Sequence, residues 1–207
     1  MPLVLQKSFN NNCTLFIWKI TENIEKLSFN IDNNPLLNEN FSHLKTDLQK
    51  KTFFSQRKLL QLANIKEEDF FYESSGKPML NNGLHISFSH SFEYVAMAIH
   101  HLPVGIDIEK IRPKLANVKR RFIDSEENFI SQNEQLNYLA IIWSAKESIY
   151  KTNNLKGIDA TKEMHIRPFQ LQQNQFEGYT TQNNIKIEYQ GIFDFLEDFV
   201  WTVVWEK

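Results

Sequence analysis

Two carboxylates placed two residues apart are the strongest candidates for chemistry in this sequence. Asp107 and Glu109 lie in the segment V-G-I-D-I-E-K, residues 104–110, where they alternate with valine and isoleucine. Such alternation predicts a strand, whose alternate side chains point to the same face, so both carboxylates lie on one side about 7 Å apart. Like charges on one face repel each other. We therefore expect a cation to bind between them.

A second candidate pair, Glu147 and Lys151, lies in W-S-A-K-E-S-I-Y-K, residues 143–151. Residues four apart share one face of a helix, and an exposed Glu–Lys helix pair is the simpler interpretation. Asp107, Glu109 and Glu147 together nevertheless offer three hard oxygen donors. Mg²⁺ prefers such donors and is usually completed by waters and substrate phosphates. Mg²⁺ is thus the predicted cation, and a solvated acidic strand edge remains the alternative.

Basic and hydroxyl side chains in short motifs are candidate phosphate contacts. Arg57 lies in S-Q-R-K-L-L, Lys77 in G-K-P and His90 in S-F-S-H-S, where Ser87 and Ser89 form a polar strand face. Each basic residue alone fits a solvated or structural role. Together they are groups that hold phosphates by charge-assisted hydrogen bonds.

The run R-P-K-L-A-N-V-K-R-R at residues 112–121 stands out because it contains five basic residues and no acidic one. One interpretation is a solvated helix face. The other is a docking patch for an acidic partner.

Composition narrows the class of protein. The chain has 207 residues and a net charge of −2, which fits one domain or two closely packed halves and does not suggest a dedicated nucleic-acid binder. The single cysteine, Cys13, cannot form an internal disulfide, which favours a reducing compartment. We see no secretory signal and no apolar run near the roughly 20 residues that cross a bilayer. We expect a soluble, cytoplasmic protein without membrane contact.

Hydrophobic periodicity predicts an α+β fold. Strands are expected at 13–20, 85–91, 94–99, 104–109, 185–189 and 199–205, and helices at 41–63, in part of 113–130 and at 134–151. A break is expected in the first helix near Thr52-Phe53. The three consecutive strands between residues 85 and 109 suggest an antiparallel meander. Strands and a helix occur in each half, which suggests two similar halves.

Five motifs in order resemble the 4′-phosphopantetheinyl transferase superfamily, in its long, surfactin-synthetase-activating (Sfp-type) branch. They are G-K-P at 76–78, I-S-F-S-H-S at 86–91, G-I-D-I-E at 105–109, R-F-I-D-S-E-E at 121–127 and W-S-A-K-E-S-I-Y-K at 143–151. The resemblance spans roughly residues 57 to 157.

This resemblance implies a holo-carrier-protein synthase. Such enzymes move the phosphopantetheine arm of coenzyme A to a serine of an acyl or peptidyl carrier protein, release adenosine 3′,5′-bisphosphate and use Mg²⁺. It also implies a monomer of two similar α+β halves, a pseudo-dimer, with coenzyme A in the cleft between them. The halves would be residues 1–104 and 105–207. The acidic carrier would give the run at 112–121 a purpose.

The resemblance also implies roles for single residues. Asp107, Glu109 and Glu147 would bind the metal, and Glu147 would also act as the base toward the carrier serine. Lys151 would neutralise the diphosphate.

Five further residues would contact coenzyme A. Arg57 and His90 would hold its 3′-phosphate. Lys77, Pro78 and Ser89 would contact the nucleotide.

Two other functions remain open. A different Mg²⁺-dependent phosphoryl enzyme, such as a nuclease, would use the same carboxylates, although the chain lacks a basic surface. A carrier-binding module without catalysis is the other. The sequence does not identify the carrier, which fatty-acid, polyketide and peptide synthesis would each supply.

Overall fold

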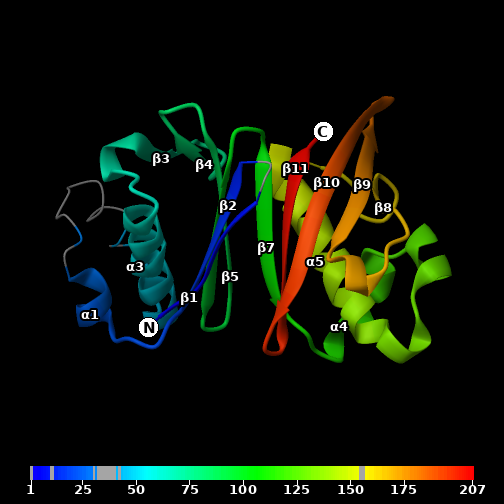
Figure 1. Ribbon diagram of the computed structural model, residues 1–207, viewed down its shortest axis with the longest axis horizontal. Helices are drawn as coiled ribbons and strands as arrows, with labels where there is room; N and C mark the ends of the chain where they lie inside the picture. The colour runs from blue at the N-terminus through cyan, green and yellow to red at the C-terminus, as the bar shows by residue number, and fades with distance from the viewer. Residues whose placement is uncertain (1, 10–11, 30, 32–40, 42, 154–156) are drawn as a thin grey trace.

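Two antiparallel sheets pack face to face, and the main helices cover their outer faces (Figure 1). The computed structural model describes residues 2–9, 12–29, 31, 41, 43–153 and 157–207. The first sheet has the order β1 (Leu3–Phe9), β2 (Cys13–Lys19), β6 (Tyr94–His100) and β5 (His85–Ser91). The second has the order β7 (Val104–Lys110), β11 (Phe199–Glu206), β10 (Ile185–Leu196), β9 (Gln175–Gln182) and β8 (Met164–Ile166). β3 (Phe70–Tyr72) and β4 (Pro78–Leu80) form a separate small hairpin.

Helices lie mainly outside the sheets. The described residues form the α-helices α1 (Ile24–Ser28), α3 (Asp47–Leu62), α4 (Lys114–Val118) and α5 (Gln135–Asn153). Short 3₁₀ turns are η1 (Glu67–Asp69), η2 (Lys119–Arg121), η3 (Ser125–Phe129), η4 (Gln132–Glu134) and η5 (Leu171–Gln173).

The break expected at Thr52-Phe53 was wrong, because α3 runs through both residues. A capping box stabilises its start: Thr46 accepts a hydrogen bond from the Gln49 backbone N–H, and the Gln49 side chain accepts one from Thr46. Thr52 and Phe53 are buried, so their packing outweighs the weak helix preference of such residues. Residue 42 of the predicted helix lies outside the described residues.

The alternation of β2 explains the layers. Cys13, Leu15 and Ile17 lie in the core between the two sheets, whereas Phe16 and Trp18 lie in the core beneath α3. Successive strand residues point to opposite faces, so the apolar residues of this strand contribute to two cores at once.

The same alternation places the candidate carboxylates. Val104, Ile106 and Ile108 of β7 lie in the core between the sheets. Asp107 and Glu109 therefore occupy the opposite face of β7, on the side that α5 covers.

The predicted meander was only partly right. β5 and β6 pair antiparallel, but β7 pairs with β11 of the second sheet and not with β6. The apolar face of β7 packs against the first sheet. The free edge of β7 lies beside β5, to which serine side chains join it. β1, β8 and β9 were not predicted, because their sequences mix polar and apolar residues without a clear period.

Gly105 allows α5 to lie directly on β7. A Cβ atom at this position would meet the backbone oxygen of Ser148 at 1.8 Å, so no other residue fits without moving the helix. This close approach brings the end of α5 within reach of Asp107.

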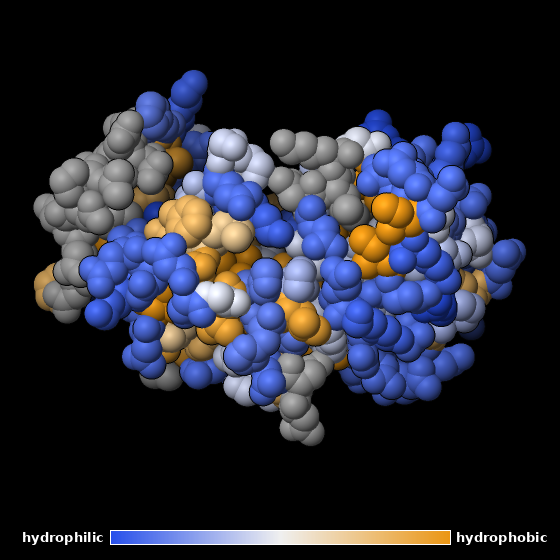
Figure 2. All heavy atoms as spheres, turned by 90° about the horizontal axis from the view of Figure 1, so that it is seen from above, coloured by the Kyte–Doolittle hydropathy of each residue, from blue (hydrophilic) through white to orange (hydrophobic). Residues whose placement is uncertain are grey.

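The face of the molecule seen from above is mostly hydrophilic, with hydrophobic groups gathered in patches toward its middle (Figure 2). Among the described residues, no helix is long and apolar enough to cross a membrane.

Candidate functional site

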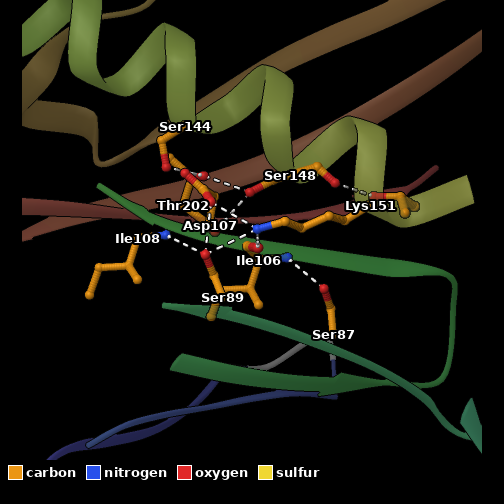
Figure 3. Close-up of polar contacts among 10 residues, drawn as sticks. Ser87, Ser89, Ile106, Asp107, Ile108, Ser144, Ser148, Lys151 and Thr202 are labelled. Atoms are coloured by element: carbon orange, nitrogen blue, oxygen red, sulfur yellow. Dashed lines mark hydrogen bonds and ion pairs between the residues drawn. The ribbon is translucent and has the colours of Figure 1, made fainter. Parts of the chain in front are cut away.

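Lys151 and Asp107 form an ion pair where α5 passes over β7 (Figure 3). The Lys151 ammonium donates to Asp107 Oδ1 at 2.8 Å, to Ser89 Oγ at 3.0 Å and to the Ile106 carbonyl at 3.0 Å. All three N–H donors of the ammonium are thus used. The predicted positive partner of Asp107 is, in this structure, Lys151.

Ser89 joins this pair to the seam between the two sheets. Its hydroxyl donates to Asp107 Oδ1 at 2.8 Å and accepts from the Ile108 backbone N–H at 3.3 Å. Two residues earlier, the Ser87 hydroxyl accepts from the Ile106 backbone N–H at 3.2 Å. Serine side chains of β5 therefore satisfy backbone groups on the edge of β7 where no strand pairs with it.

A buried group of hydroxyls lies on the other side of Asp107. Thr202 of β11 is the direct cross-strand neighbour of Asp107, and the Ser148 hydroxyl is 2.7 Å from the Thr202 hydroxyl. Ser144, one turn earlier on α5, lies 3.0 Å from the same hydroxyl. These contacts fix α5 against β11 and so fix the position from which Lys151 projects toward Asp107 (Figure 3). Glu147 lies one turn before Lys151 on the same helix.

Glu147 and Glu109 are carboxylates with raised proton affinity. Partial burial raises the pKa of Glu147, and the negative charges of Asp107 and Glu109 raise it further, against the opposing charge of Lys151. Partial burial also raises the pKa of Glu109, while its 2.9 Å bond from Arg112 opposes the rise. Glu147 makes no hydrogen bond or ion pair with any described residue. It is therefore available to accept a proton or bind a cation.

The chemistry of these carboxylates fits a hard cation. The charge of Asp107 raises the pKa of both Glu109 and Glu147, so the three carboxylates lie close together. Mg²⁺ favours such oxygen donors. Within the described part of the chain, however, no three acidic, histidine or cysteine side chains are gathered as metal ligands. Lys151 and Ser89 hold Asp107, and Arg112 holds Glu109.

A pocket of about 360 Å³ lies beside this site. Lys77, Pro78 and Lys151 line it, so the G-K-P turn and the end of α5 face each other across it. The Lys77 ammonium donates to the Thr152 carbonyl at 2.7 Å, and burial lowers the pKa of Lys77. The remaining lining residues are Gln56, Tyr72, Ser75, Gly76, Ile86, Ser87, Phe88 and Tyr150.

Three predicted contacts, Ser89, His90 and Arg57, lie outside that lining. His90 follows Ser89 on β5, is exposed and makes no hydrogen bond with a described residue. Arg57 is buried at 2% exposure, with its guanidinium 4.0 Å from the Phe53 ring centroid and Nε 3.2 Å from Glu67. It lines a different hollow, of about 680 Å³, between α3 and η1. The structure therefore does not bring Arg57 together with Lys77, Pro78 and Lys151.

The basic run at 112–121 divides into paired and unpaired cations. Arg112 pairs with Glu109, and Lys119 pairs with Glu127 at 2.8 Å. Lys114, Arg120 and Arg121 are exposed and have no ion-pair partner among the described residues.

Sequence reasoning missed several residues around the site. Tyr72 and Tyr150 line the pocket and expose 41% and 40% of their surface, yet no motif marked them as contacts. Ser144 and Ser148 had a usable signal, because hydroxyls four apart mark one face of a helix that otherwise reads as apolar. Thr202 had no such signal, since only strand pairing places it beside Asp107.

A family comparison supports these observations. The sequence model described as the 4′-phosphopantetheinyl transferase superfamily matches residues 103–204. That range contains β7, α5 and the second sheet, and therefore Asp107, Glu109, Glu147 and Lys151.

Curated relatives carry names from the same superfamily. The chain is 31% identical to "4′-phosphopantetheinyl transferase gsp" of Aneurinibacillus migulanus over 134 residues, which are 62% of this chain and 54% of the relative. It is 31% identical over 118 residues to "4′-phosphopantetheinyl transferase Sfp" of Bacillus subtilis (strain 168), covering 54% and 51%. For "4′-phosphopantetheinyl transferase psf-1" of Bacillus pumilus the identity is 37% over 95 residues, covering 43% and 40%. The chain spans about half the length of the curated relatives it matches.

Proposed function

Because residues 103–204 match the sequence model of the 4′-phosphopantetheinyl transferase superfamily, we propose that the chain transfers 4′-phosphopantetheine from coenzyme A to a serine of an acyl or peptidyl carrier protein. The other product is adenosine 3′,5′-bisphosphate. The observation that carries this proposal is the meeting of Lys151 and Asp107 beside Glu147 and next to the Lys77–Pro78 pocket.

Coenzyme A is proposed to enter through that pocket. Lys77 and Lys151 place two ammonium groups along its wall, which suits the phosphates of the nucleotide. Ser89 and His90 lie next along β5, within the same region. Arg57 is proposed only as a support beneath the pocket wall, since its guanidinium is buried between Phe53 and Phe70.

The proposed reaction forms one phosphorus–oxygen bond and breaks another. The carrier serine oxygen attacks the β-phosphorus of coenzyme A, and the bond from that phosphorus to the bridging oxygen breaks. The leaving oxygen stays on the α-phosphate of adenosine 3′,5′-bisphosphate. Lys151 stabilises the charge that develops on the diphosphate.

Glu147 is proposed as the group that receives the serine proton. Its partial burial and the neighbouring negative charges raise its pKa, which makes it a stronger base than an exposed carboxylate. Asp107, Glu109 and Glu147 are the residues that would hold Mg²⁺, which would supply further charge neutralisation at the diphosphate.

The halves are proposed to divide near residue 104, as a pseudo-dimer with coenzyme A between them, and the chain to act as a monomer. Each half supplies part of the site. Ser89 and Lys77 come from the first, and Asp107 and Lys151 come from the second.

Intact-mass spectrometry tests the function. The protein is mixed with coenzyme A, Mg²⁺ and either an apo acyl carrier protein or an apo peptidyl carrier domain. We expect the carrier to gain the mass of one phosphopantetheine, and expect EDTA or Glu147→Gln to abolish the gain. Circular dichroism checks that the variant is folded. Absence of the gain with both carriers would contradict the proposal; the nuclease alternative has no support in the relatives, which are named as transferases.

A further inference from the structure

Phe92 is an exposed aromatic residue held in an unfavourable backbone conformation. Ser91 pairs with Tyr94, so Phe92 and Glu93 alone form the turn between β5 and β6. Phe92 is 46% exposed and has a φ of +52°. Hairpin turns favour glycine or asparagine at such positions, and a bulky side chain there is strained. The other described non-glycine residues with positive φ are asparagines and Glu197.

Two cations that follow the candidate carboxylates lie near the ring of Phe92. Lys110 Nζ and Arg112 Cζ are each 5.2 Å from its centroid, and the ring meets Phe199 edge-on at 6.2 Å. Arg112 also donates to Glu109 at 2.9 Å. One arginine side chain therefore separates Phe92 from the proposed site of transfer.

The charge around this ring favours an acidic partner. Arg112 begins the basic run, and beyond it Lys114, Arg120 and Arg121 are exposed without an ion-pair partner among the described residues. The acidic residues of the neighbouring β10–β11 turn are already neutralised, because Glu197 pairs with Lys19 and Asp198 with Lys110. Glu93, in the same turn as Phe92, is the opposing charge. An acidic partner is thus attracted along the α4 side of Phe92.

We propose that Phe92 is the apolar anchor of a docking surface for the acidic carrier protein, with Arg112 and the basic run beside it. This inference rests on the proposed transferase function. Binding energy at protein interfaces concentrates in a few aromatic and arginine residues, and a strained residue kept against local preference points to such a role. A carrier seated on Phe92 would lie one arginine side chain away from Glu109.

Phe92→Gly separates docking from folding. Glycine accepts the positive φ without strain, so we expect an unchanged or higher melting temperature. We expect the Kd for the apo carrier, measured by calorimetry without coenzyme A, to rise at least about tenfold. The KM for coenzyme A should stay within twofold of wild type, while the KM for the carrier rises in parallel with the Kd.

Leu102→Ala is the matched control. Leu102 is 45% exposed but lies in the β6–β7 turn, at the opposite end of β7 from Lys110. Its carrier Kd should equal that of wild type. As a second variant, Phe92→Leu keeps an apolar side chain and should retain more affinity than Phe92→Gly.

The outcomes distinguish the two proposals. If wild type modifies the carrier and Phe92→Gly binds it as tightly as wild type, the anchor is wrong and the transferase stands. If wild type modifies the carrier and only Phe92→Gly loses affinity, both stand. If wild type neither binds nor modifies an acyl or a peptidyl carrier, both are overturned.

Discussion

Lys151 Nζ lies 2.8 Å from Asp107 Oδ1, so the lysine proposed to neutralise phosphate is bonded to a residue proposed to bind metal. The same ammonium also donates to Ser89. In this arrangement the charged groups of the site pair with one another: Lys151 with Asp107, and Arg112 with Glu109. Loading it with coenzyme A and Mg²⁺ requires these partners to exchange.

Lys151→Met should make the protein more responsive to Mg²⁺. Removing the ammonium leaves Asp107 without its cation, so we expect a lower melting temperature and a larger rise on addition of Mg²⁺ than in wild type. Scanning fluorimetry across a MgCl₂ titration measures this. The kcat should fall by about 10²- to 10³-fold.

Lys66→Met is the control for that titration, because Lys66 is an exposed lysine that pairs with Glu68 at the surface. Its Mg²⁺ response should match that of wild type. Equal responses in Lys151→Met and wild type would contradict competition for Asp107.

Gly105→Ala should destabilise the fold by about 1–3 kcal/mol or more. The added methyl group would meet the Ser148 backbone oxygen at 1.8 Å, which forces α5 away from β7. Urea denaturation gives the change in free energy of unfolding.

Gly83→Ala is the matched comparison, since it has a positive φ of 80° but open space around it. We expect it to cost about 1–2 kcal/mol, from the left-handed backbone alone, and less than Gly105→Ala. If both variants lost the same stability, the close approach of α5 would not be what Gly105 permits.

Lys146→Met should destabilise the protein strongly at neutral pH. Lys146 and Glu126 form an ion pair of 2.8 Å with side chains 2% and 0% exposed. Removing one partner of such a pair typically costs about 3–5 kcal/mol, because the other charge stays buried. The double variant Glu126→Gln, Lys146→Met should recover part of this loss.

The deficit of Lys146→Met should shrink as pH falls. Burial raises the pKa of Glu126, but Lys146 and two backbone N–H donors lower it by more. The pKa of Glu126 is therefore below its ordinary value of 4.5. Its stabilisation in wild type is present above that value and is lost as pH falls below it. In the variant, protonation relieves the unpaired charge instead. Urea denaturation between pH 7 and pH 4 measures both curves, and a constant difference would contradict this account.

Cys13 should be inert to alkylation in the folded protein. Burial raises the pKa of its thiol to about 12, so at pH 8 only about one thiol in 10⁴ is ionised, and the thiolate is the reactive form. Iodoacetamide followed by intact-mass measurement should label it only in urea. Rapid labelling without denaturant would show that the thiol is accessible.

The sequence predicted most elements whose apolar residues recur with a clear period. α5 and the strands at 13–19 and 199–206 appear with ends within two residues of expectation. β10 was predicted over only its first part, 185–189, and extends to Leu196. Sheet membership was less accessible, because it depends on which strands find each other in space. β7 follows β6 closely in the chain and still joins the other sheet.

The sequence indicated which residue types form the candidate site, but it did not indicate which of their side chains contact each other. The faces of β7 and α5 followed from periodicities of two and of three to four. The ion pair between Lys151 and Asp107 could not be predicted from the sequence, because it depends on the position of α5 along β7. Gly105 and the Ser148–Thr202 contact determine that position. The sequence around Arg57 did not indicate its surroundings, because the guanidinium lies against the rings of Phe53 and Phe70.

The hydroxyl of Ser89 has a single proton, and Asp107 holds it. A phosphate oxygen can receive that proton only when Asp107 no longer does. Asp107 gives it up most readily when a cation takes its place, and the same change frees Lys151. If nucleotide and metal bind here as proposed, their occupancies would be linked through one shared proton, and joint arrival of the two would be favoured over the arrival of either alone.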